Sequence, residues 1–240
     1  MRRAADRRLG GENPVARGGL DCEHAPVSVV PREIRALYSA KTITVYQAYS
    51  PEIAGPAAAE RRFPDGYDRG RMTWIKPSFL WMMYRSSWGS AVGQERVLAI
   101  RIHRDGFEWA LAHSALSGYN GRVHASRDQW KRDMRRSPVR IQWDPERDLH
   151  LRPMPHRSLQ VGLRGEAVDR YLDEWIEGID DVTELAHAVH ELTREGSGER
   201  AARLLPVERS YPLPGTLASR IDASPMEPRP GGRTTARTGV

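Results

Sequence analysis

Residues 157–176, RSLQVGLRGEAVDRYLDEWI, switch from one hydrophobic period to another. Leu159 and Val161 alternate with polar or small residues, which is typical of a half-buried strand. From Glu166 onward the apolar residues recur at helical spacing instead, and Gly178 is expected to end that helix. The stretch therefore predicts a strand followed directly by an amphipathic helix.

Strands are expected to dominate upstream of this switch and helices downstream of it. Segments 42–49, 96–103, 138–143 and 157–163 are β-branched and aromatic or alternate in polarity, so they predict strands. Short helices are expected between them, at 51–63, 79–85, 107–114 and 126–136, with turns at 105–106 and 144–148. A late helix over 182–192 completes a C-terminal helical pair. The sequence therefore predicts an α+β fold with flanking helices and a mixed or antiparallel sheet of at least four strands.

The two ends of the chain differ from its middle in composition. Residues 1–26 and 196–240 mix Arg, Gly and Pro without hydrophobic periodicity. This composition predicts two disordered, arginine-rich tails. Residues 27–195 are then expected to form a single α+β domain, long enough to bury a hydrophobic core.

The net charge of +6 is unevenly distributed along the chain. Residues 61–163 hold 19 Lys or Arg against 10 Asp or Glu, whereas residues 164–195 hold 3 against 10. An acidic helical layer that packs beside a basic sheet layer would explain this division. A phosphate-bearing ligand near the middle segment would explain it too, and the sequence leaves both interpretations open.

Cysteine usage and hydropathy predict a cytoplasmic protein. Cys22 is the single cysteine of the chain, so neither an intrachain disulfide nor a cysteine-rich metal site is expected. The N-terminus has no apolar signal core, and the longest apolar run, 79–84, is far shorter than the roughly 20 residues that span a bilayer. We therefore expect no membrane partner.

Common catalytic and metal-binding motifs are missing from the sequence. The phosphate loop, the dinucleotide-binding glycine pattern and the nucleophile elbow are all absent. His187 and His190 lie three residues apart, but no further ligand motif accompanies them. No metal is expected, and those enzyme classes are set aside.

The most informative segment is 72–88, MTWIKPSFLWMMYRSSW, because it mixes aromatic rings with cations. One interpretation is a core helix flanked by stacking arginines. The other is a pocket that stacks a flat ring and neutralises a phosphate. The candidate residues for such a pocket are Trp74, Lys76, Ser78, Tyr84, Arg85 and Trp88.

Lys76 immediately precedes Pro77, which favours an extended backbone just before a helix. Helix N-termini offer free N–H donors to an anion, so a phosphate site is predicted here. A lysine is rarely buried without a partner, and its ammonium group is therefore expected to reach a cleft or the surface. On that basis Lys76→Ala should change the free energy of unfolding by at most about 0.5 kcal/mol.

Two glutamines and one histidine are further candidates. Gln160 lies in a predicted strand and can project into a cleft, as can Gln47, which has Tyr46 and Tyr49 beside it. A polar strand face exposed to water is the alternative for both glutamines. His113 ends a predicted helix, where it either caps the last carbonyls or contributes to a site.

Much of the chain resembles a family of bacterial and fungal proteins called domain of unknown function 4291. The resemblance covers residues 32 to about 192 and is most specific in TWIKPSFLWMMYRS, residues 73–86. Further matching segments are TITVYQAYSPEIA, QERVLAI, GFEWALAHS, SPVRIQWDPERDL and RSLQVGLRGEAVDRYLDEWI. The family has no established activity, so this resemblance implies no particular reaction.

Residues 45–63, VYQAYSPEIAGPAAAERRF, are also similar in outline to the ADP-ribosyltransferase superfamily. That resemblance implies NAD as the cofactor. It implies that Gln47 holds the NAD ribose, that Tyr84 or Ser78 packs against the nicotinamide, and that Gln160 orients the acceptor. Gln47 departs from the superfamily, which has His or Arg there, and Gln160 is not an acid.

The leading hypothesis is an intracellular, nucleotide-binding domain resembling ADP-ribosyltransferases. Its expected catalytic residues are Gln160, Tyr84 and Gln47. Its expected ligand-binding residues are Tyr46, Tyr49, Trp74, Lys76, Ser78, Arg85, Trp88 and His113. The alternative is a nucleic-acid-binding module without catalysis, which would use the arginine-rich tails and a basic helix containing Arg127, Lys131, Arg132, Arg135 and Arg136.

Overall fold

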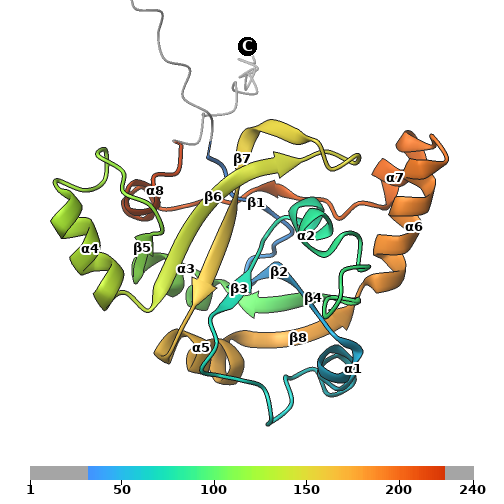
Figure 1. The fold of residues 1–240 in the computed structure, drawn as a ribbon, viewed down its shortest axis with the longest axis horizontal. Helices are drawn as coiled ribbons and strands as arrows, with labels where there is room; N and C mark the ends of the chain where they lie inside the picture. The colour runs from blue at the N-terminus through green and yellow to red at the C-terminus, as the bar shows by residue number, and fades with distance from the viewer. Residues whose placement is uncertain (1–31, 225–240) are drawn as a thin grey trace, which may run out of the picture.

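The computed structural model describes residues 32–224, which form two main sheets surrounded by helices (Figure 1). The predicted tail over residues 1–26 and residues 225–240 of the second predicted tail lie outside the described residues. No helix within residues 32–224 has the length and apolar character needed to cross a membrane.

The two main sheets differ in strand direction. The first is antiparallel, with strand order β2 (Thr42–Tyr49), β4 (Arg96–His103), β8 (Ile176–Asp181). The second is mixed, because its edge strand β5 runs parallel to β6, and its order is β3 (Thr73–Ile75), β7 (Pro153–Leu163), β6 (Val139–Arg147), β5 (Ser114–Leu116). A short ribbon pairs β1 (Arg35–Ala36) with β9 (Arg209–Ser210). The predicted α+β class, with a mixed sheet of four strands, is confirmed.

Helices fill the connections between strands, and two of them start at the serines that the sequence marks. The Ser78 hydroxyl accepts a hydrogen bond from the Trp81 N–H at 3.2 Å, and Ser126 accepts one from Gln129 at 3.1 Å. Such N-caps satisfy backbone donors that a helix start leaves free. The helices are α1 (Pro51–Glu60), α2 (Phe79–Ser86), α3 (Arg104–Ala112), α4 (Arg127–Arg136), α5 (Glu166–Arg170), a π-helical turn (Tyr171–Trp175) and α6 (Thr183–Arg194).

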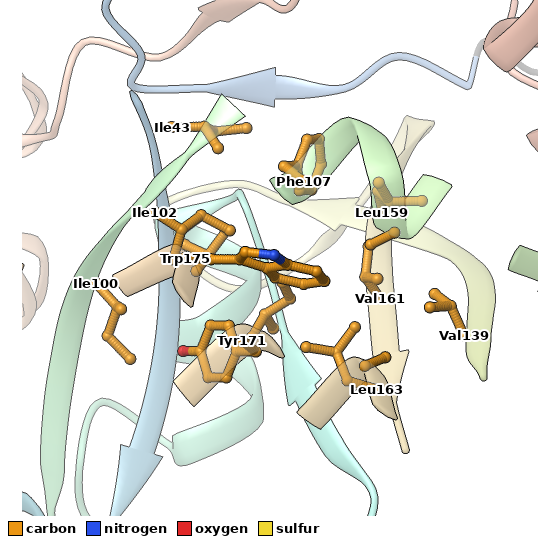
Figure 2. Close-up of a cluster of buried hydrophobic side chains, with 14 of the residues drawn as sticks. Ile43, Ile100, Ile102, Phe107, Val139, Leu159, Val161, Leu163, Tyr171 and Trp175 are labelled. Atoms are coloured by element: carbon orange, nitrogen blue, oxygen red, sulfur yellow. The ribbon is translucent and has the colours of Figure 1, made fainter. Parts of the chain in front are cut away.

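The larger hydrophobic core lies between the two main sheets (Figure 2). Ile43 and Ile102 enter it from the antiparallel sheet, and Leu159 and Val161 enter it from the mixed sheet. Trp175 lies between these two groups. Burial of each such aliphatic side chain contributes about 1.5–3 kcal/mol, so this layer fixes the position of one sheet against the other.

The predicted long helix from Glu166 to Gly178 is wrong in its second half. The helical segment ends at Trp175, and Ile176–Asp181 forms β8, which pairs with β4. Ile179 fits a helical period but lies opposite Ile100 in the sheet. The pairing of β8 with a strand more than seventy residues earlier in the chain decides this conformation, and local periodicity does not contain that information.

The predicted turn at Asp105 and Gly106 is also wrong, because both residues lie inside α3. Gly106 instead allows the Trp175 ring to pack closely against α3. A Cβ atom on Gly106 would lie only 2.4 Å from the Trp175 ring, so the indole can pack against this part of the helix only because the side chain is absent.

The predicted tail from residue 196 is wrong over its first part. Residues 198–221 contain α7 (Gly198–Leu204), β9 and α8 (Gly215–Ile221). Tyr211 and Ile221 are buried in the larger core. A segment without hydrophobic periodicity is ordered here because a few apolar residues reach a core that the rest of the chain has already formed.

Ion pairs join the basic middle of the chain to the acidic segment after it. Arg69 contacts Asp169 at 3.0 Å and Asp173 at 2.7 Å, and Arg96 contacts Asp181 at 2.8 Å. The packing of acidic against basic segments therefore accounts for part of the charge division. It does not explain the basic residues that take no part in such pairs.

Candidate functional site

A cavity of about 640 Å³ opens where the antiparallel sheet meets the mixed sheet. The Tyr46 N–H donates to the Lys76 carbonyl oxygen at 2.7 Å, which joins β2 to the end of β3. The cavity volume lies within the range of roughly 300–1,000 Å³ that is usual for small-molecule sites. Six of the predicted site residues line it: Gln47, Tyr49, Trp74, Lys76, Arg85 and Gln160.

A chain of hydrogen bonds crosses the floor of the cavity from the core to β3. The Tyr171 hydroxyl donates to Gln47 Oε1 at 2.7 Å, and Gln47 Nε2 donates to the Tyr49 hydroxyl at 2.8 Å. Tyr49 and Tyr67 share a further bond of 2.8 Å, as do Tyr67 and Thr73. Since Tyr49 accepts from Gln47, its own hydrogen is free for Tyr67. Burial raises the pKa of Tyr49 and Tyr171 well above the usual value, so both phenols stay protonated.

This chain of bonds changes the interpretation of Gln47. Its side chain is only 3% exposed, and its amide nitrogen also donates to the Trp74 carbonyl oxygen at 3.2 Å. Both ends of the amide are therefore engaged within the protein. Through these hydrogen bonds Gln47 links β2 to β3 and to the π-helical turn.

A carboxylate holds the two glutamines of the opposite wall. Gln142 and Gln160 face each other across β6 and β7. Gln142 Nε2 donates to Asp144 at 3.0 Å, and Gln160 Nε2 donates to the other oxygen of the same carboxylate. Each glutamine thereby uses its NH₂ group within the protein and keeps its amide oxygen available to a ligand.

Lys76 is the most unusual residue of the cavity, because its side chain is 5% exposed yet forms no salt bridge with any described residue. Its ammonium group has one distant contact, the Trp74 carbonyl oxygen at 3.5 Å. The pKa of Lys76 is lowered to about 8, mainly by burial and also by the nearby Arg85, while Asp144 acts in the opposite direction. The ammonium group was expected to reach a cleft or the surface, and Lys76 does line the cavity.

Two arginines and one indole complete the cavity lining. Arg71 and Arg85 line the cavity with exposed side chains, and neither forms a salt bridge with the described part of the chain. Trp74 packs on the β7 backbone, where a Cβ on Gly162 would lie 3.0 Å from the indole ring. The ring therefore has a fixed orientation at the cavity edge.

The other predicted residues lie outside the cavity lining. Tyr46 is buried against Phe79 with ring centroids 5.5 Å apart, and Ser78 caps α2. Tyr84 lies on the outer side of α2 beneath the Arg147 guanidinium, 3.6 Å away. Trp88 stacks on His190 at 5.1 Å.

His113 also lies outside the cavity lining, at the end of α3. Its Nδ1 lies 2.8 Å from the Trp109 carbonyl oxygen, and its ring stacks on Trp109 with centroids 4.0 Å apart. Of the two interpretations that the sequence left open, this geometry is that of a helix cap.

The predicted anion site at the start of α2 is wrong, because a side chain already occupies it. The Phe79 N–H donates to Glu208 Oε1 at 2.7 Å. The pKa of Glu208 is raised to about 8, mainly by burial and also by the neighbouring Glu146, while the Phe79 N–H and Arg35 act in the opposite direction. The Glu208 carboxyl group therefore takes the Phe79 N–H, and the Ser78 hydroxyl takes the Trp81 N–H, so these donors of the helix start are not free for a phosphate.

Sequence reasoning missed several residues of the site. Tyr67 and Arg71 lie in a turn-rich stretch with no periodic signal, and Asp144 falls where a turn was expected. Of these missed residues, Gln142 could have been found from the sequence, because it lies in a predicted strand as Gln160 does. Weighing both glutamines would have indicated a polar wall.

The family comparison agrees with the resemblance seen in the sequence. A family model described as Domain of unknown function (DUF4291) matches residues 33–211. This range contains every lining residue discussed above, and Glu208 as well. None of the curated proteins matches the chain.

Proposed function

The chain belongs to the family described as Domain of unknown function (DUF4291), and from this starting point we propose that its cavity binds a phosphorylated nucleotide, with NAD as the first candidate. One observation carries the proposal. The buried ammonium group of Lys76 lines a cavity together with Arg71 and Arg85, and none of the three forms a salt bridge with a described residue.

The energetic cost of Lys76 supports an anionic ligand. A fall in pKa from 10.5 to about 8, at about 1.4 kcal/mol per pH unit, means that the charged amine costs the fold roughly 3 kcal/mol at neutral pH. A phosphate group that contacts Lys76 and Arg85 would offset this cost through charge-assisted hydrogen bonds. The surrounding acids, Asp68 and Asp144, are too few to balance the three cations.

The opposite wall supports a nucleotide rather than free phosphate. The amide oxygens of Gln142 and Gln160 are left to accept hydrogen bonds, because their NH₂ groups are held by Asp144. A carboxamide or an exocyclic amino group supplies such donors. Trp74 and Tyr49 add aromatic surface for a flat ring.

The resemblance to ADP-ribosyltransferases supports NAD as the nucleotide and ADP-ribosyl transfer as the reaction. In that reaction the bond between nicotinamide and the ribose carbon breaks, and the same carbon bonds to an acceptor. We assign Gln160 to orienting the acceptor. Gln47 would act by holding β2 and Tyr49 in place, since its own amide is engaged by Tyr171 and Tyr49.

Calorimetric titration of the full chain with NAD, ADP-ribose, ATP and GTP tests the proposal. We expect saturable binding of NAD or ADP-ribose. Lys76→Met and Arg85→Met should each weaken it by tenfold or more, because each loses a charge-assisted contact. Lys41→Met is the matched control, since Lys41 is exposed, immediately precedes β2 and lies outside the cavity lining.

The result that would overturn the proposal is equally concrete. If none of the four nucleotides gave heat of binding or a thermal shift, the proposal of nucleotide binding would be rejected. Equal losses in Lys76→Met and Lys41→Met would show that net charge, and not the cavity, determines binding. Binding without release of nicotinamide in the presence of acceptor proteins would retain the ligand and reject the reaction.

A further inference from the structure

Helix α4 has one face against the protein and one face in solvent. On the inner face the Trp130 Nε1–H donates to the Leu116 carbonyl oxygen at 2.9 Å, and Gln129 and Asp133 line a second hollow. The outer face contains one acid, Asp128, and the following exposed cations: Arg127, Lys131, Arg132, Arg135 and Arg136. None of these five cations forms a salt bridge within residues 32–224. The structure thus separates a cationic face that the linear sequence shows only as a mixed run.

The negative end of α4 is already neutralised from the protein side. Arg140 donates to the Ser137 carbonyl oxygen at 2.8 Å, and Arg164 donates to the Arg135 carbonyl oxygen at 2.8 Å. These guanidinium groups satisfy the carbonyls that a helix C-terminus leaves free. The side chains of Arg135 and Arg136 are therefore not required as caps and extend the cationic face.

An aromatic platform adjoins the start of the same face. Tyr119 is 37% exposed, and the Arg127 guanidinium lies 4.7 Å from its ring centroid. His124 stacks on the same tyrosine with ring centroids 6.1 Å apart. Aromatic rings and arginine planes of this kind are surfaces on which unpaired bases stack.

The second hollow, of about 490 Å³, lies between α4, β5 and α8. Hydrogen-bonding side chains line it, including His124, Gln129, Asp133 and Arg220. Both donors and acceptors are thus present beside the aromatic platform, as the recognition of a base edge requires. The hollow is distinct from the nucleotide cavity, because the two share no lining residue.

We propose that the outer face of α4, with Tyr119 and the second hollow, binds single-stranded nucleic acid. The phosphates lie along the cations of α4, and a base stacks at Tyr119 or enters the hollow. A duplex would use the cations alone, because its bases are already paired and stacked. The proposal is independent of the nucleotide cavity, which lies at β2, β3 and α2, whereas α4 lies at the far left of the view in Figure 1.

The test measures fluorescence anisotropy of a labelled single-stranded oligonucleotide of about 16 nucleotides with the full chain. The double variant Arg132→Gln with Arg135→Gln removes two cations from the face. The matched control, Arg200→Gln with Arg203→Gln, removes the same charge from exposed positions on α7, at the opposite end of the molecule (Figure 1). All proteins keep both arginine-rich ends of the sequence, so the comparison isolates α4.

We expect the α4 variant to lower the slope of log affinity against log salt by about 1.4, at about 0.7 per lost phosphate contact, and to weaken binding on the order of twentyfold at 0.1 M salt. The α7 control should bind as the parent does. Tyr119→Ala should weaken binding without changing the salt slope, because stacking releases no counterions.

Three results would overturn the proposal. Equal losses in the α4 and α7 variants would attribute binding to net charge. If the parent protein bound no oligonucleotide at low salt, nucleic-acid binding by the α4 face would be rejected. If a duplex bound with the same affinity as the single strand, and Tyr119→Ala did not change that affinity, unpaired bases would have no role in binding. Circular dichroism of each variant verifies that it remains folded.

Discussion

The nucleotide cavity and helix α4 both present cations without an acidic partner among residues 32–224, but they differ in exposure. Lys76 is 5% exposed, whereas Lys131 and its neighbours on α4 extend into solvent. An unpaired cation in water costs almost nothing, while a buried one costs several kcal/mol. The single buried lysine is therefore the stronger sign of a ligand site, although α4 carries more charge. The predictions below test this contrast from its largest expected effect to its smallest.

Glu208 tests the cost of burying a carboxylate, as Lys76 tests the cost of burying an ammonium group. Its pKa is raised from 4.5 to about 8, so the folded state holds a proton that the unfolded state has lost. The stability that this provides is complete below pH 4.5 and is lost as the pH rises through about 8. We expect the free energy of unfolding to fall by up to about 4 kcal/mol over this window.

Glu208→Gln should remove that pH dependence, since an amide stays neutral and its oxygen still accepts from the Phe79 N–H. Urea unfolding of parent and variant at pH 5 and pH 8.5 measures the difference. The two proteins should be similar at pH 5, and the variant should be the more stable at pH 8.5. A parent whose stability is the same at both pH values would show that Arg35 balances Glu208 and Glu146.

Lys76→Met tests the cation of the cavity. The limit of about 0.5 kcal/mol expected from the sequence assumed an ordinary surface lysine, whereas Lys76 is buried. Methionine keeps the unbranched stem and removes the charge, so the variant should be more stable than the parent by about 2 kcal/mol at pH 7. This corresponds to a rise in Tm of roughly 4–8 °C. Lys41→Met and Lys131→Met, both at exposed positions, should leave Tm unchanged. If Lys76→Met lowers Tm instead, the ammonium group has a structural partner and does not await a ligand.

The sequence predicted those parts of the fold that local signals determine. The strand 42–49 matches β2, the strand 96–103 matches β4, and Ser78 and Ser126 cap helices as expected. Alternation and capping depend on neighbours within a few residues, so a single sequence contains them.

The remaining features depend on residues far apart in the chain. Ile176–Asp181 becomes a strand because β4 is available beside it, and Glu208 occupies the start of α2 from more than a hundred residues away. The burial of Lys76 likewise follows from the pairing of Tyr46 with the end of β3. The candidate site was therefore predicted in its residue types and in six of its positions, and missed in its geometry.

The affinity of the cavity for an anion should depend on pH through Lys76. Its pKa of about 8 in the free protein means that the ammonium group is charged below that value and neutral above it. A bound phosphate favours the charged form, so affinity should be constant below about pH 7.5 and fall by up to tenfold per pH unit above pH 8. Titration of ADP-ribose between pH 6.5 and 9.5 measures this. Lys76→Arg should bind without the fall, because arginine stays charged; a parent with a flat profile would exclude Lys76 from the contact.

The smallest expected effect is that of the α4 cations on stability. Arg132 lies three and four residues before Arg135 and Arg136, spacings at which like charges repel by about 0.2–0.5 kcal/mol per pair. Loss of a cation near a helix C-terminus costs a similar amount, but Arg140 and Arg164 already satisfy those carbonyls. Arg132→Gln with Arg135→Gln should therefore change the free energy of unfolding by less than about 0.5 kcal/mol, with a slight gain at low salt that disappears at high salt. Urea unfolding at two salt concentrations, beside the α7 variant, measures this. A loss above about 1 kcal/mol would mean that these arginines hold the fold together, and the contrast between a costly buried cation and inexpensive exposed ones would fail at α4.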